Sequence, residues 1–200
     1  MKKIELTQVI RRGGLSLEQT IEQRRSMRRF SGESISQEDL SYLLFYSNGI
    51  TDRRHGKRAA PSAGATYPIE VYIVVNNVEG LDRGIYHYLL PDNALELVRE
   101  GDFGQEMVRA SMGQKMMAQA SVVLMMTAII RRTERIYGER ASRYVILDAG
   151  HIAQNTYLMA ASMGLGSCAV GAFYDDDFNR LLGVDGKSES VLYMMAVGRA

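Results

Sequence analysis

The chain has 200 residues, 46% of them hydrophobic, and a formal net charge of +1 at pH 7. This length allows one substantial core, and no Pro-, Gly- or Ser-rich linker divides the chain, so we expect a single domain over residues 1–200. A nearly neutral chain differs from the basic domains that bind nucleic acid, and no nucleic-acid partner is expected.

The sequence also argues against a membrane protein. The longest apolar run, residues 120–130, is interrupted by Ser121 and Thr127 and is too short to span a bilayer. The charged N-terminal residues are followed by no apolar segment of the kind found in secretory leaders. The single cysteine, Cys168, excludes an internal disulfide and fits a reducing compartment. We therefore expect a cytoplasmic protein with no membrane partner.

Two helix starts are predicted in the first quarter of the chain. Ser16 and Gln19 have capping-box spacing and open a helix that leads into an arginine-rich segment. This helix is expected to present the arginines at its C-terminal end. Ser36 opens a second helix, which Gly49 is expected to end.

Strands and one long helix are predicted in the remainder. Strands are predicted over residues 69–75, 85–90, 95–98, 121–129 and 191–197, and the second and third of these form a hairpin. The longest helix is predicted over roughly 144–163, with Gly164 as its cap. Its small residues allow close approach of another helix, so we expect both a core position and a subunit contact: Ala149, Gly150, Ala153, Ala160 and Ala161.

The most informative segment is residues 23–30, with the sequence QRRSMRRF. Four arginines around Ser26 can bind a phosphate through charge-assisted and bidentate hydrogen bonds. Taken alone, however, a cluster of arginines can equally be a solvated surface without a ligand. The small residues between the prolines of segment 60–68 (APSAGATYP), together with Arg199, favour a phosphate joined to a planar ring, as in a flavin.

Residues 164–169 match the dinucleotide-binding pattern G-x-G-x-x-A. That pattern binds pyrophosphate where a strand leads into a helix. Here a helix is expected to end at Gly164 and a strand to follow, which favours a helix cap and a tight turn.

Other reactive side chains have simpler explanations. Cys168 is expected to be a small buried side chain rather than a nucleophile, and His151 a structural histidine with satisfied hydrogen bonds. The three aspartates 175–177 are expected to cap the N-terminus of a helix over residues 178–182. The three histidines and Cys168 lack the paired spacings of metal ligands, so no metal site is predicted.

Seven segments together resemble the nitroreductase flavoprotein family, specifically its SagB-type dehydrogenase branch. They are residues 24–30, 61–68, 84–88, 137–141, 143–144, 148–151 and 198–199, and the match extends from about Leu15 onward. The resemblance implies an α+β, nitroreductase-like fold in which helices surround a central, mainly antiparallel sheet. It also implies a domain-sharing homodimer with two FMN sites at the subunit interface, and NADH or NADPH as candidate reductants.

The resemblance implies roles for individual residues. Arg24, Arg25, Ser26 and Arg199 would hold the phosphate and ribityl end of FMN. Arg28 matches the position beside N1 and the C2 carbonyl, where a positive charge favours the reduced ring. The loop that reaches the ring from the partner subunit is matched by Pro61, Ser62, Ala63 and Gly64. The backbone that lies along the ring and can donate to N5 is matched by Ala169, Val170, Gly171 and Ala172.

The implied chemistry is hydride transfer through flavin N5, to or from a small conjugated substrate such as a nitro compound, a quinone or an unsaturated heterocycle. In the SagB-type branch the implied reaction oxidises azoline rings of a peptide to azoles, which requires a base. A non-catalytic or redox-sensing flavoprotein is a further alternative. Arg28 and Tyr137 are the candidate catalytic residues.

The sequence departs from the branch at the proposed base. A Lys-Tyr pair usually precedes Gly-x-Arg-Ala, whereas this chain has Ile136 before Tyr137. A tyrosine side chain, with a reference pKa of about 10, is a poor base at neutral pH without a neighbouring ammonium. Arg135 cannot replace the lysine as a base because arginine stays protonated. We therefore expect azoline oxidation to be impaired more than flavin binding.

Overall fold

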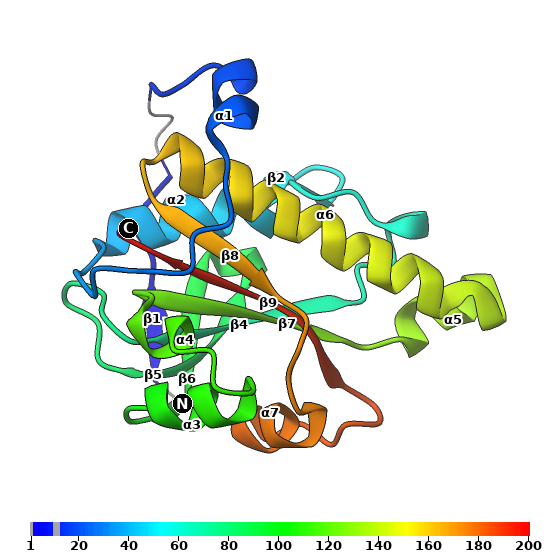
Figure 1. Cartoon of the computed structure of the whole chain (residues 1–200). Helices are drawn as coiled ribbons and strands as arrows, with labels where there is room; N and C mark the ends of the chain where they lie inside the picture. The colour runs from blue at the N-terminus through cyan, green and yellow to red at the C-terminus, as the bar shows by residue number, and fades with distance from the viewer. Residues whose placement is uncertain (1, 10–12) are drawn as a thin grey trace.

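The computed structural model describes residues 2–9 and 13–200. The expectation that the N-terminal residues form no secretory leader therefore lies partly outside the described residues. Its central element is a seven-stranded sheet in the order β1-β6-β5-β4-β7-β9-β8. Every neighbouring pair in it is antiparallel. Helices lie on both sides of the sheet (Figure 1). The predicted fold class is confirmed.

The strands of the large sheet are β1 (Lys3–Glu5), β4 (Ile69–Val75), β5 (Gly84–Leu89), β6 (Ala94–Glu100), β7 (Val122–Ala128), β8 (Gly166–Val170) and β9 (Ser190–Gly198). A separate ribbon pairs β2 (Ile50–Asp52) with β3 (Lys57–Arg58). The helices are α1 (Leu17–Gln23), α2 (Gln37–Asn48), α3 (Gly104–Ala110), α4 (Met116–Gln119), α5 (Arg131–Tyr137), α6 (Ala141–Ser162) and α7 (Asp175–Leu182). Short 3-10 turns are η1 (Ala63–Ala65), η2 (Leu90–Asp92) and η3 (Gly138–Arg140).

Local signals in the sequence explain several boundaries. Ser16 accepts a hydrogen bond from the Gln19 amide, and the Gln19 side chain accepts one from the Ser16 amide, which completes the predicted capping box. Ser36 caps α2, and Gly49 ends it as predicted. β7 is buried at every position because helices cover both faces of the sheet around it.

Two hydrophobic cores lie on opposite faces of the sheet. Between the sheet and helices α2 and α6, the first core contains Leu43, Leu44 and Ile152. Between the sheet and helices α3, α4 and α7, the second contains Met107 and Phe178. The molecule thus has a helix layer, a sheet and a second helix layer (Figure 1).

Helix α6 has a buried side and an exposed side. Ala149, Ala153 and Ala160 are buried against the sheet and α2, which confirms the core position predicted for this helix. On the other side, Ile146 and Leu147 are 59% and 53% exposed. α6 is followed by β8, so the glycine pattern at 164–169 spans a helix end and a strand, as expected. Among the described residues, no helix is long and apolar enough to cross a membrane.

Candidate functional site

The arginine-rich segment runs along the free edge of β8. Helix α1 ends at Gln23 with Arg24 as its C-cap, so the expectation that the helix presents the arginines holds for Arg24 only. Ser26 forms a parallel bridge with Ser167, and the Met27 amide donates to the Ser167 carbonyl at 2.8 Å. The segment is extended because it pairs with unsatisfied backbone groups of an edge strand.

Tyr157, on α6, fixes this segment in place. Its hydroxyl lies 3.0 Å from Ser26 Oγ and accepts a hydrogen bond from the Ala169 amide at 2.7 Å. The Arg24 guanidinium lies over the Tyr157 ring, 5.2 Å from its centroid, in a cation–π contact. The role of Tyr157 was not predicted, because no local pattern in the sequence distinguishes it from the other tyrosines of the chain.

Five arginines give this region its charge: Arg24, Arg25, Arg28, Arg29 and Arg199. None of them forms an ion pair with another described residue. Arg199 is held by backbone, since its Nε donates to the Ser34 carbonyl at 3.0 Å. Arg28 follows Met27, whose amide is bound to β8. Burial raises the pKa of the Cys168 thiol, and the charge of Arg28 opposes this. Such a set of unpaired guanidinium groups fits a phosphate-bearing ligand.

The segment at the end of β8 was expected to offer small residues and free backbone amides to a flavin ring. The small residues Gly171 and Ala172 are exposed, but one of the amides is already bonded. The Ala169 amide donates to Tyr157, so it is not available to a bound ring. Gly171 and Ala172 follow the end of β8 and are exposed. Because amides alternate between the two edges of a strand, the Gly171 amide is the next on the edge used by Ala169.

The loop that precedes β4 is anchored by a buried carboxylate. Asp148, which is 4% exposed, accepts hydrogen bonds from Ser62 Oγ at 2.5 Å and from the Ala63 amide at 3.2 Å. Ser62 Oγ in turn accepts from the Tyr67 amide at 2.9 Å. Asp148 belongs to a segment that carried the family resemblance, but its role as an anchor was not predicted.

Tyr137 packs on this loop. A Cβ built on Gly64 would lie 2.9 Å from Tyr137 Oη, and Gly64 has φ of +57°. The Tyr137 ring meets the Tyr144 ring edge to face, with centroids 4.8 Å apart. Ile136, in contrast, is 61% exposed. Two further residues of the loop, Ala65 and Tyr67, also have positive φ, so the backbone is held in a costly conformation.

The sequence-predicted residues therefore form two groups. The arginine group consists of residues 24–28, 169–172 and 199, and the loop group consists of residues 61–64 with Tyr137. Asp148 and Tyr157, which anchor the two groups, are about 14 Å apart along α6 at a rise of about 1.5 Å per residue. Tyr137 lies farther still, before the start of α6, while α1 lies near the other end of this helix (Figure 1). One chain does not bring the two groups together.

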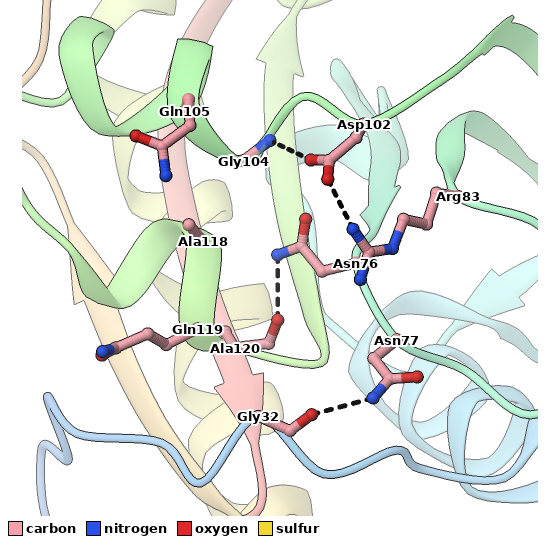
Figure 2. A pocket seen from close by; sticks show the side chains of 10 residues that line it. All are labelled: Gly32, Asn76, Asn77, Arg83, Asp102, Gly104, Gln105, Ala118, Gln119 and Ala120. Carbon is pink, nitrogen blue, oxygen red and sulfur yellow. Dashed lines mark hydrogen bonds and ion pairs between the residues drawn. The ribbon is translucent and has the colours of Figure 1, made fainter.

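A separate pocket of about 180 Å³ lies between the start of α3 and α4 (Figure 2). Its polar groups largely bind one another. Asn76 donates to the Ala120 carbonyl at 2.9 Å, and Asp102 binds both Arg83 and the Gly104 amide. No residue of the arginine group or the loop group lines it, and we assign it no part in the site.

The other reactive side chains named from the sequence lie outside the two groups. Cys168 is buried, as expected. His151 is exposed on α6, so the expectation of a satisfied structural histidine is wrong. Helix α7 begins at Asp175 with Tyr174 as its N-cap and no side-chain cap hydrogen bond, so the expectation that the three aspartates cap the helix is wrong. They form its first turn instead, where their charge complements the helix dipole. In residues 2–9 and 13–200, no group of three or more His, Cys, Asp or Glu side chains could hold a metal ion.

Comparison with known proteins identifies the family of this chain. The model of the nitroreductase family matches residues 21–199. The chain belongs to the nitroreductase family. It is 40% identical over 185 residues to a Methanocaldococcus jannaschii protein assigned as a nitroreductase, covering 92% of this chain and 91% of the relative. A crystal structure of a Ralstonia eutropha protein, also assigned as a nitroreductase, has a TM-score of 0.88 at 26% identity, covering 100% of this chain and 90% of that one.

Two further relatives of this nitroreductase-family chain bear on ligands and substrates. The microcin B17-processing protein McbC of Escherichia coli is 26% identical over 162 residues, covering 78% of this chain but 59% of the relative. The chain thus spans little more than half the length of that processing protein. A nitroreductase-like structure from Desulfovibrio desulfuricans in complex with FMN has a TM-score of 0.63 at 19% identity, covering 94% and 87% of the two chains, and shows similarity of fold.

Proposed function

We propose that this nitroreductase-family protein is an FMN-dependent oxidoreductase that acts on small conjugated substrates and works as a cytoplasmic homodimer of single-domain subunits. The observation that carries the proposal is the set of arginines without a carboxylate partner beside β8, where Tyr157 binds Ser26 and stacks with Arg24. A phosphate would satisfy these guanidinium groups, and the exposed Gly171 and Ala172 leave room beside them for a flat ring. The FMN-bound structural relative supports the same ligand.

The two groups of residues support an interface site. Since they lie toward opposite ends of α6, a single chain cannot apply both to one flavin. A two-fold partner can bring its loop group to the arginine group of the first subunit, and symmetry then generates two sites. The exposed Ile146 and Leu147 give α6 an apolar surface suited to such a contact.

The proposed roles combine these positions with those that the family resemblance implies. Arg24, Arg25, Ser26 and Arg199 bind the phosphate and ribityl end, and Arg28 lies beside the ring. The Gly171 amide, rather than that of Ala169, donates toward N5, while the segment from Ala169 to Ala172 borders the ring. FMN, when bound, supplies two-electron hydride transfer through N5. The partner's loop, residues 61–64, excludes water from the opposite side of the ring, and NADH or NADPH is the proposed reductant.

A second candidate function is oxidation of azoline rings in a peptide, as in the SagB-type branch. Similarity to McbC favours it. The exposed Ile136 in place of a lysine opposes it, because Tyr137 then has no adjacent ammonium to favour its deprotonation. A third alternative is a flavoprotein whose flavin has a structural or redox-sensing role. That role would explain the arginine group, but it assigns no function to the contact between Tyr137 and the loop.

Binding of FMN to an Arg24→Ala variant tests the proposal. Loss of one charge-assisted hydrogen bond to phosphate should weaken binding by about 2 kcal/mol. Arg54→Ala is a matched control, because Arg54 is an exposed arginine on the turn between β2 and β3, outside both groups. Equal FMN affinity in the Arg24→Ala variant and the control would overturn the assignment of the arginine group.

A further inference from the structure

A second pocket lies beside the end of the loop before β4, and we call it the Arg58 pocket. It has a volume of about 410 Å³ and opens between β3, β5, η2 and α5. The residues that matter to its chemistry are Arg58, Tyr67, Glu70, His87, Pro91 and Arg132. His87 and its neighbours on β5 belong to a segment that carried the family resemblance but received no role in the proposed site.

The pocket contains more positive than negative charge. Glu70 accepts a hydrogen bond from Arg132 Nη1 at 2.5 Å and contacts His87 Nε2 at 3.0 Å, so this carboxylate is committed to two partners. Arg58 forms no ion pair with any carboxylate of residues 2–9 and 13–200. Two guanidinium groups therefore face one carboxylate, which leaves a net charge of +1 when His87 is neutral.

The Arg58 guanidinium is held in place by an aromatic contact but makes only a long hydrogen bond. Its guanidinium carbon lies 4.3 Å from the centroid of the Tyr67 ring, and its Nη1 donates to the Ile69 carbonyl at a long 3.5 Å. Desolvation by burial lowers the pKa of Arg58, although the charge of Glu70 opposes this. A half-buried cation without an anionic partner is costly, so an anion that enters the pocket gains the interaction that is missing.

We propose that the Arg58 pocket binds a small organic anion, whose carboxylate or phosphate oxygens pair with Arg58 and whose apolar body lies against Pro91. Carboxylate and phosphate share the paired oxygens that match the fork of a guanidinium group. Arg132, which is paired with Glu70, also lines the pocket. This site is distinct from the arginine group and does not depend on flavin binding. Its occupant would contact the loop through Tyr67 and α5 through Arg132, two segments that also meet at Tyr137.

Calorimetric titration of the purified protein, saturated with FMN, with benzoate, phenyl phosphate and uncharged benzamide tests the proposal. At least one anion should bind, and benzamide should bind roughly tenfold or more weakly, because it cannot form the charge-assisted pair. The tighter of the two anions identifies the natural group as carboxylate or phosphate. Failure of both anions to bind, or equal binding of benzamide, would overturn the proposal.

Variants locate the site. Arg58→Gln should weaken anion binding roughly tenfold or more, while Arg54→Gln, on the same ribbon but outside the pocket, should leave it unchanged. Arg24→Gln should also leave it unchanged, which separates this pocket from the arginine group. If Arg58→Gln does not fold, Arg58→Lys retains the charge without the fork and should still weaken binding several-fold. Wild-type affinity in the folded Arg58 variants would contradict the proposal.

Discussion

The hydroxyl of Tyr157 lies 3.0 Å from Ser26 Oγ, although the two residues are 131 positions apart in the chain. The same hydroxyl accepts the Ala169 amide, so one side chain of α6 joins the arginine segment to β8. This arrangement fixes Arg24 over the Tyr157 ring. If the arginine group binds a phosphate as proposed, its affinity should depend on Tyr157, which need not touch the ligand.

Replacement of Tyr157 by Phe should weaken FMN binding by about 1–2 kcal/mol, because the variant frees Ser26 and leaves the Ala169 amide without its acceptor. Riboflavin, which lacks the phosphate, should lose less affinity than FMN. Tyr174→Phe is the matched control, since Tyr174 is 54% exposed and lies outside the site. Equal losses for FMN and riboflavin would show that Tyr157 acts on the ring end instead.

The contact between Gly64 and Tyr137 predicts a specific cost of adding one methyl group. Gly64→Ala places a Cβ 2.9 Å from Tyr137 Oη at φ of +57°. Gly56 has a similar φ of +63° and nothing within 4 Å of its Cβ position, so Gly56→Ala measures the backbone cost alone. The free energy of unfolding should fall by about 1 kcal/mol more for Gly64→Ala than for Gly56→Ala. Equal losses in chemical denaturation would show that Tyr137 does not press on the loop.

The exposed apolar side of α6 predicts the oligomeric state. Ile146→Asp should dissociate the proposed homodimer and reduce FMN affinity with it, because a ligand that contacts both subunits stabilises the assembled state. Met112→Asp is the control, since Met112 is similarly exposed, at 55%, in the segment between α3 and α4. Sedimentation analysis at micromolar concentration distinguishes the outcomes. A wild-type protein that sediments as a monomer with FMN bound would contradict the interface site.

The residue before Tyr137 predicts which reaction is favoured. Ile136→Lys restores a Lys-Tyr pair at an exposed position, so azoline oxidation should appear or increase while quinone reduction changes little. Arg135→Lys is a useful control, because it adds an amine one position farther away. If the wild-type protein oxidises azoline peptides efficiently and Tyr137→Phe has no effect, the base lies elsewhere.

Local sequence signals were sufficient for most of the fold. Ser16 and Ser36 satisfy backbone groups within three residues of themselves, and β7 is recognisable from its own apolar run. The start of α6 was placed three residues late, because η3 leads into the helix and no side-chain cap marks its first turn. Signals of this kind extend over one turn of chain and carry no information about distant partners.

The organisation of the site depended on contacts that the sequence does not display. The arginine segment is extended because Ser26 pairs with Ser167, and the two positions are joined only by the fold. Tyr157 and Asp148 also bind residues that are distant in the sequence, so their roles as anchors are shown only by the structure. The resemblance to a family indicated the candidate site residues, whereas their division into two groups is visible only in the structure.

The visible absorption spectrum of the purified protein is the first test of whether the protein binds FMN. We expect a yellow protein that releases FMN when denatured, one per subunit, and an apoprotein that recovers the flavin spectrum when FMN is added. A colourless protein that does not bind added FMN would show that the proposed flavin site is wrong.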